Sequence, residues 1–111
     1  MEEVSYDDFK KLQMCVGLVK EVDRIPGTDK LFKMQIDIGK SKLIQIVTSL
    51  VDHYRASELK DKKIIVLTNL KSSQFAGQVS EGMLLCAEKE DKSKCVLLTI
   101  DKDIEQGTPV T

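Results

Sequence analysis

The chain has 111 residues, enough for one ordinary domain with one hydrophobic core. A composition of 41% hydrophobic and 32% charged residues is typical of a soluble globular protein and excludes a largely disordered or membrane-embedded chain. The formal net charge of −1 by itself indicates no nucleic-acid partner. The charge nevertheless varies along the chain, with net +4 over residues 20–72 between two net-acidic ends. This pattern fits either one positive face or an ordinary mixed surface.

The first predicted element is a short helix. Ser5 and Asp8 resemble a capping box, which predicts a helix over residues 5–12. The apolar residues on one side of this helix are expected to hold it against the core: Tyr6, Phe9 and Leu12.

Three strands are predicted next, over residues 14–22, 32–38 and 43–47. The second is the clearest, because its apolar residues alternate strictly with polar ones: Phe32, Met34, Ile36 and Ile38. The third is apolar on both faces, which predicts a central position in a sheet. Between the first two strands, Ile25 to Thr28 has the residues of a turn.

The second half of the chain predicts further short elements. They are a helical connection over 51–59, a strand over 63–67, a polar loop over 69–82, a hairpin of 83–87 with 95–99, and a turn-rich tail over 104–110. Five or six short strands with little helix indicate an all-β fold, and so short a chain favours a closed barrel that leaves no exposed edges. We therefore expect residues 1–111 to form a single domain, a five-stranded Greek-key OB-fold barrel with a short N-terminal helix and a C-terminal extension.

Few residues could support catalysis or bind a metal ion. His53 is the only histidine, and the three cysteines form no Cys-x-x-Cys pair, which argues against a metal centre, a disulfide framework and a Cys–His nucleophile. The glycines are isolated, so no phosphate-binding loop is indicated. The sequence predicts a non-catalytic protein without metal or cofactor. Free cysteines and the acidic start at Glu2 and Glu3, unlike a secretory signal, predict a cytoplasmic location.

A binding surface remains as the expected functional feature. Seven lysines of the basic section can contact phosphate: Lys30, Lys33, Lys40, Lys42, Lys62, Lys63 and Lys71. Aromatic residues are scarce, and we expect Tyr6, Phe9 and Phe32 to be buried. Tyr54 and Phe75 are then the remaining candidates for stacking on bases. This composition favours recognition of nucleic acid by shape and backbone over base-by-base stacking.

Short strings of residues, in order along the chain, resemble those of the tRNA-binding domain family. Residues 25–31, Ile-Pro-Gly-Thr-Asp-Lys-Leu, are similar to its His-Pro-x-Ala-Asp-Lys-Leu, and residues 46–50, Ile-Val-Thr-Ser-Leu, to its Ile-Val-Ser-Gly-Leu. Asn-Leu-Lys at 69–71 and Ser-Glu-Gly-Met-Leu-Leu-Cys-Ala at 80–87 resemble its Asn-Leu-Lys-Pro and Ser-x-Gly-Met-Ile-Leu-Ala-Ala. The resemblance covers nearly the whole chain, through a tail similar to the family's Thr-Pro-Asp-Arg-Asp ending.

The resemblance implies the same barrel and a function in RNA binding. Family members include free-standing tRNA-binding proteins, domains or beta chains of methionyl-tRNA synthetase, and a chaperone-like secretion protein. By this resemblance, the chain is expected to bind folded tRNA through its shape and phosphate backbone, without catalysis. It is also expected to form a homodimer through its terminal segments, and to serve as an accessory beta-type subunit beside a methionyl-tRNA synthetase catalytic chain. The alternative is a chaperone-like peptide-binding secretion protein of the same fold.

The resemblance also implies an RNA-binding site that includes Lys30, Asn69, Lys71, Ser80 and Met83, and to these we add Lys33 from the basic section of the chain. Lysine side chains would contact phosphate, Ser80 would donate to phosphate or ribose, and Met83 would pack on a base or ribose. Four of these residues have an alternative role: Asn69 as a turn or cap residue, Met83 as a core residue, Lys30 in a surface ion pair, and Lys71 as an ordinary surface lysine.

The chain departs from the family pattern in the loop that contains this site. Ser72 stands at the position of the family's proline, and Gln74 and Ala76 stand where basic residues are usual. Fewer phosphate contacts predict weaker tRNA binding than a basic family member would show, or reliance on a partner.

Overall fold

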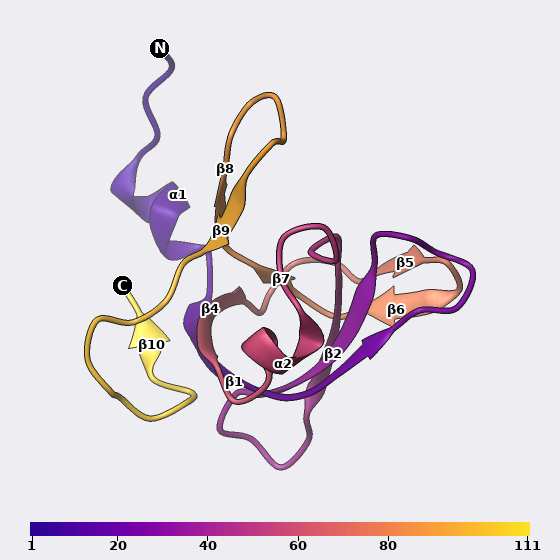
Figure 1. Ribbon diagram of the computed structural model, residues 1–111. Helices are drawn as coiled ribbons and strands as arrows, with labels where there is room; N and C mark the ends of the chain where they lie inside the picture. The colour runs from indigo at the N-terminus through magenta and orange to yellow at the C-terminus, as the bar shows by residue number, and fades with distance from the viewer.

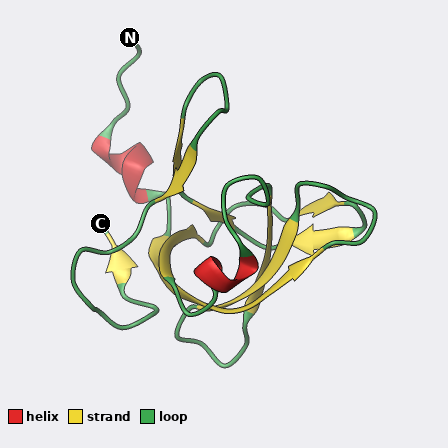
Figure 2. Cartoon of the chain, viewed as in Figure 1, coloured by secondary structure: helices red, strands yellow, loops and turns green.

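The computed structural model describes residues 1–111, whose regular secondary structure is mostly strands, with two short helices (Figures 1 and 2). Five strands make the barrel: β1 (Met14–Arg24), β2 (Phe32–Asp37), β3 (Ile44–Thr48), β4 (Lys63–Leu67) and β7 (Met83–Leu84). All neighbouring pairs are antiparallel, in the order β3-β2-β1-β4-β7. The structure confirms the predicted barrel, nearly closed, in which β3 and β7 face each other across the remaining gap.

β1 is the strand that bends the sheet into a barrel. Its first half, from Met14 to Leu18, pairs with β4, and its second half, to Arg24, pairs with β2. The register shifts between Val19 and Glu21, which is the position of a β-bulge, and bulges sharpen the local bend of a strand. Gly17 lies at the inner side of this bend, where an added Cβ would stand 2.6 Å from the Ile36 side chain.

The core fills the barrel as the alternation predicts. Met34 and Ile36 of β2 are fully buried, as is Ile46 of β3. The predicted helical connection over 51–59 is shorter in the structure, where α2 covers only Ala56–Leu59. In the view of Figure 1, α2 lies within the ring formed by the barrel strands. Leu59, with no exposed surface, joins the core from this helix. Neither helix of the chain has the length and apolar character needed to cross a lipid bilayer.

We expected a polar loop over residues 69–82, but in the structure this segment contains a hairpin. Its strands are β5 (Ser73–Phe75) and β6 (Gln78–Ser80). Ala76 and Gly77 connect them with φ angles of 51° and 79°, the positive values of a two-residue type I′ turn. The alanine hides the signal from sequence reasoning, because asparagine or glycine usually marks such a turn.

The predicted hairpin of 83–87 with 95–99 is confirmed only in part. The first segment divides at Leu85: β7 pairs with β4 of the barrel, whereas β8 (Cys86–Glu88) pairs with β9 (Cys95–Leu97). Figure 1 shows β8 and β9 as a hairpin that projects away from the barrel.

The N-terminal helix is present but is not buried. α1 covers Tyr6–Lys10, and the Ser5 Oγ accepts a hydrogen bond from the Asp8 backbone N–H at 3.0 Å, as the capping pattern predicts. The expected burial of Tyr6 and Phe9 is wrong, because these side chains are 70% and 42% exposed, and Leu12 is 47% exposed. One turn and a half of helix lies outside the barrel, so its apolar side meets no core.

The tail ends as a short strand beside the start of β1. β10 (Pro109–Val110) pairs with Met14 and Cys15, which places the end of the chain close to the first barrel strand. Two side-chain contacts hold the preceding turn. The Lys63 Nζ lies 2.7 Å from the Asp103 carboxylate, and the Gln106 amide donates to Asp37 at 3.0 Å.

Candidate nucleic-acid interface

The gap between β3 and β7 is closed by hydrogen bonds between β3 and the residues Ser80 and Glu81, which we call the clasp. The backbone N–H groups of Gln45 and Val47, on the free edge of β3, donate to the Glu81 carboxylate at 2.9 Å and to the Ser80 Oγ at 3.0 Å. The Glu81 N–H in turn donates to the Gln45 carbonyl at 2.7 Å. We expected the third strand to be central in the sheet, and this expectation is wrong, because β3 pairs with only one strand, β2. On its other edge, backbone groups of Gln45 and Val47 bind the clasp instead of a neighbouring strand.

Ser80 is a structural member of the clasp. Its side chain is only 4% exposed, and the hydroxyl accepts from Val47 and donates to the Gly82 carbonyl at 3.1 Å. A contact with phosphate or ribose would require the hydroxyl to leave these partners. Of the Ser-x-Gly-Met string, Glu81 and Met83 have accessible side chains, and Met83 is 39% exposed at the start of β7.

Asn69 joins the barrel to the N-terminal segment. Its side-chain oxygen accepts from the Gln13 N–H at 2.9 Å, and its amide nitrogen donates to the Lys11 carbonyl at 2.6 Å. Both ends of the amide thus bind the backbone just after α1. This geometry corresponds to the alternative role of Asn69, that of a residue which caps backbone groups.

The three candidate lysines differ in how free their charges are. The Lys30 ammonium lies 2.9 Å from the Asp52 carboxylate, and this hydrogen bond raises the pKa of Lys30 and lowers that of Asp52. Lys33 is half-buried on the outer side of β2, and Lys71 is exposed. Neither of these two forms an ion pair in the structure. In the sheet register, Asp23 of β1 lies directly opposite Lys33 of β2, although the two side chains form no ion pair. The surroundings of Lys33 are therefore mixed in charge.

The outer side of β2 and β3 is continuous with the β5–β6 hairpin. The Gln35 amide donates to the Gln45 side-chain oxygen at 3.0 Å, and the Gln45 amide donates to the Val79 carbonyl of β6 at 2.8 Å. We did not predict a role for Gln45 or Glu81. The sequence signal for Gln45 is its place as the polar residue of an otherwise apolar strand, whereas no local signal marks Glu81.

The two aromatic candidates have different surroundings. The Tyr54 hydroxyl accepts from the Leu97 N–H at 3.0 Å, and the Lys62 ammonium lies 5.9 Å from its ring centroid. Tyr54 is thus engaged within the protein. Phe75 is 40% exposed at the end of β5, and neither the aromatic pair nor the cation–π contacts of the chain include it.

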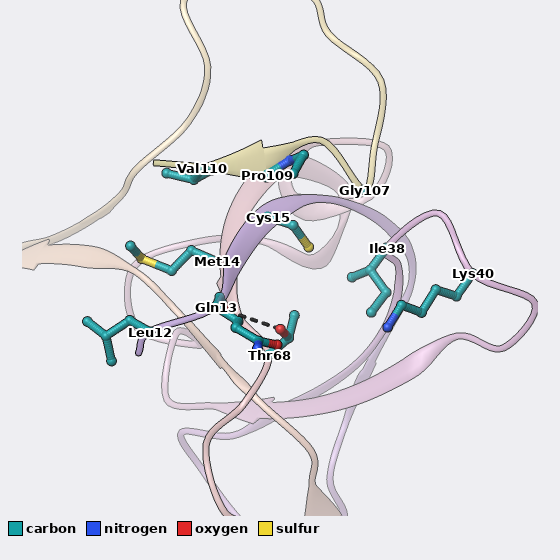
Figure 3. A pocket seen from close by; sticks show the side chains of 10 residues that line it. All are labelled: Leu12, Gln13, Met14, Cys15, Ile38, Lys40, Thr68, Gly107, Pro109 and Val110. Carbon is teal, nitrogen blue, oxygen red and sulfur yellow. Dashed lines mark hydrogen bonds between the residues drawn. The ribbon is translucent and has the colours of Figure 1, made fainter. Parts of the chain in front are cut away.

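A separate pair of grooves lies at the terminal segments. A pocket of about 300 Å³ runs between α1 and β10 and is lined by Tyr6, Phe9, Lys10, Leu12, Val110 and Thr111. A second pocket, of about 380 Å³, adjoins it and is drawn in Figure 3. Cys15, Ile38 and Lys40 line this pocket. Gln13 and Thr68 line it too, and the Thr68 hydroxyl donates to the Gln13 carbonyl at 3.0 Å. Burial raises the pKa of the Cys15 thiol.

Comparison with known proteins agrees with this geometry. Residues 14–109 match the model of the family described as "Putative tRNA binding domain". The methionine–tRNA ligase of Archaeoglobus fulgidus is 43% identical over 109 residues, which are 98% of this chain and 16% of that protein. The chain therefore spans about one sixth of the length of this curated relative.

Two solved structures are similar over their whole length. A protein described as MetRS-related, from Pyrococcus horikoshii, has a TM-score of 0.92 and 40% identity, with all of both chains covered. The CsaA chaperone protein from Picrophilus torridus has a TM-score of 0.87 and 31% identity, with 98% of this chain and 100% of that one covered. The matched family model, the relatives and the barrel agree that this chain belongs to the tRNA-binding domain family.

Proposed function

We propose that this chain binds folded tRNA without catalysing a reaction, through the shape and phosphate backbone of the RNA. The match of residues 14–109 to the tRNA-binding domain family carries this proposal. The outer side of β2 and β3, together with the side of the β5–β6 hairpin that carries Phe75 and with Lys71 just before β5, is the surface we assign to the RNA, and we call it the β3–hairpin face. OB-fold barrels commonly bind oligonucleotides on this side and through the neighbouring loops.

The lysines of the β3–hairpin face that form no ion pair support contacts with the phosphate backbone of the RNA more than with its bases. Lys33 and Lys71 have no carboxylate partner, so each can approach a phosphate without first breaking an ion pair. Lys30 must give up Asp52 to do so. Gln74 and Ala76, in and beside β5, add no charge. We therefore expect weak, salt-sensitive binding from one copy of the chain.

Two further parts of the proposal concern partners. The relatives that are methionine–tRNA ligases, together with the MetRS-related structure, favour an accessory role beside a methionyl-tRNA synthetase catalytic chain. The groove at Tyr6, Phe9 and Val110 supports a homodimer, because a second copy would cover apolar side chains that this copy leaves exposed. Two β3–hairpin faces in one dimer would bind one tRNA more tightly through effective concentration. A cytoplasmic location remains part of the same prediction.

The central experiment measures binding of labelled folded tRNA and of single-stranded RNA of equal length over a salt series. We expect preference for folded tRNA, with affinity that falls steeply as salt rises. Absence of binding to both RNAs at low salt would contradict the proposal. Addition of a methionyl-tRNA synthetase catalytic chain then tests the accessory role, because a partner would raise its apparent affinity for tRNA.

The second candidate is a chaperone-like peptide binder of the same fold. It is favoured by the likeness to the CsaA chaperone protein and by the exposed apolar side chains of Leu70, Phe75 and Val79 around the hairpin. An unfolded, reduced polypeptide that competes with tRNA for the β3–hairpin face would support this candidate. Peptide binding without any tRNA binding would replace the first proposal by the second.

A further inference from the structure

Phe75 has a defined direction on the β5–β6 hairpin. Ser73 pairs with Ser80 and Phe75 pairs with Gln78, so these four residues share one side of the two-stranded ribbon. Gln74 and Val79 lie on the opposite side. Because the Ser80 hydroxyl binds the β3 backbone at Val47, the side that carries Phe75 is the one turned toward β3.

Register also relates this ring to a free cation. In the sheet register, Val47 of β3 lies directly opposite Lys33 of β2. On the other edge of β3, the Val47 N–H binds the Ser80 hydroxyl of β6. Phe75 stands two residues farther toward the hairpin tip, about 7 Å along the ribbon. An aromatic ring and an unpaired ammonium group are thus presented on the same β3–hairpin face.

The support of the ring is firm while its surface is open. Three contacts hold the hairpin to β3: Ser80 with Val47, Glu81 with Gln45, and Gln45 with the Val79 carbonyl. The tip is a two-residue turn of small residues, Ala76 and Gly77, that would not block a flat molecule. Phe75 is nevertheless 40% exposed, although burial of such a ring is normally favourable.

We propose that Phe75 is a stacking platform for one unpaired base of the bound RNA, with Lys33 near the adjoining phosphate. This inference rests on the proposed RNA-binding function and adds base contact to recognition by shape. Stacking accepts any base, so Phe75 would select RNA with a nucleotide outside a duplex and would not select a sequence. A tRNA loop offers such a nucleotide, whereas a blunt duplex does not.

The chain contains no tryptophan, so Phe75→Trp introduces a single tryptophan, whose fluorescence reports on this position. Val79→Trp is the matched control, because Val79 is 39% exposed on the opposite side of the same hairpin. We expect tRNA to quench the fluorescence of the Phe75→Trp protein and to leave that of the Val79→Trp protein nearly unchanged. A blunt RNA duplex should quench neither.

Affinity measurements with tRNA complete the test. Phe75→Ala and Phe75→Leu should each weaken tRNA binding about tenfold, the scale of one base–aromatic stack. Val79→Ala should change it less than twofold, and Phe75→Trp should retain it. Equal binding by Phe75→Leu and the unaltered chain, or unquenched Phe75→Trp at saturating tRNA, would overturn the inference and leave the proposed function intact. Failure of the unaltered chain to bind any RNA would overturn both.

Discussion

The Ser80 hydroxyl accepts a hydrogen bond from the backbone N–H of Val47, 33 residues earlier in the chain, at 3.0 Å. This contact lies where a fully closed barrel would continue its strand ladder. The family resemblance assigns Ser80 to RNA binding, whereas in this chain its hydroxyl holds two parts of the barrel together. A substitution at Ser80 distinguishes the structural role from the RNA-binding role.

Ser80→Ala should destabilise the protein without altering the RNA surface. The change leaves the buried Val47 N–H without an acceptor, so we expect the free energy of unfolding to fall by about 1–3 kcal/mol. Urea denaturation measures this, and Ser73→Ala, the exposed neighbour in register, is the control. A tenfold loss of tRNA affinity in folded Ser80→Ala protein would instead support direct contact with RNA.

Lys71→Ala should reduce both the affinity for tRNA and its salt dependence. Each phosphate contact contributes roughly one unit to the slope of log affinity against log salt, so the slope should become shallower by about one. Lys94→Ala, on the β8–β9 hairpin, removes the same charge away from the β3–hairpin face. Equal slopes for the Lys71 and Lys94 variants would argue for a nonspecific charge effect.

Acid should loosen the C-terminal tail through Asp37. The N–H of Gly39 and then the amide of Gln106 hold the pKa of Asp37 below its ordinary value of 3.8. A lowered pKa in the folded state stabilises the protein above the unfolded-state value, and this contribution is lost as pH falls through the folded-state pKa. We expect Asp37→Asn to show a smaller decrease in Tm between pH 5 and about pH 3 than the unaltered chain. Parallel pH profiles would contradict the assignment.

A charge placed in the terminal groove should separate the proposed dimer. Phe9→Asp would bury a carboxylate wherever a second copy covers α1, which costs more than the contact contributes. Analytical ultracentrifugation should then give a mass near 12.5 kDa for the variant and about twice that for the unaltered chain. A monomer before the substitution would remove the dimer proposal.

The native thiols should react slowly with alkylating reagents. Burial and then the neighbouring Cys95 raise the pKa of Cys86 to about 12, and burial also raises the pKa of Cys15. Because the thiolate is the reactive form, thiol titration at pH 8 should be at least about tenfold slower in the folded protein than in urea. A rapid reaction of one native thiol would show that a cysteine is more accessible than the structure indicates.

Periodicity predicts the barrel well because its core obeys a simple alternation. In β2, Met34 and Ile36 face inward while Lys33 and Gln35 face outward, and the structure confirms this pattern. The helix start at Ser5 is likewise a local property of the sequence and is confirmed.

The errors concern features that depend on distant residues. The apolar side of α1 has the spacing of a buried helix, but nothing in the local pattern reveals that the barrel ends before reaching Tyr6. Ser80 and Glu81 meet β3 only after the whole barrel has formed, so their partners cannot be read from neighbours. The hairpin at Ala76 was hidden by an alanine in a conformation that favours glycine.

The clasp also gives the barrel a line along which it can open. Elsewhere each barrel strand is joined to its neighbour by a ladder of backbone bonds. β3 is instead joined to residues 79–81 by three hydrogen bonds that involve a side chain and by one backbone bond, from the Glu81 N–H to the Gln45 carbonyl. The amide protons of Gln45 and Val47 should therefore exchange with solvent sooner than those in the middle of β1. A molecule bound across both sides of this seam would slow that exchange, so amide protection could reveal ligand binding even without an enzymatic assay.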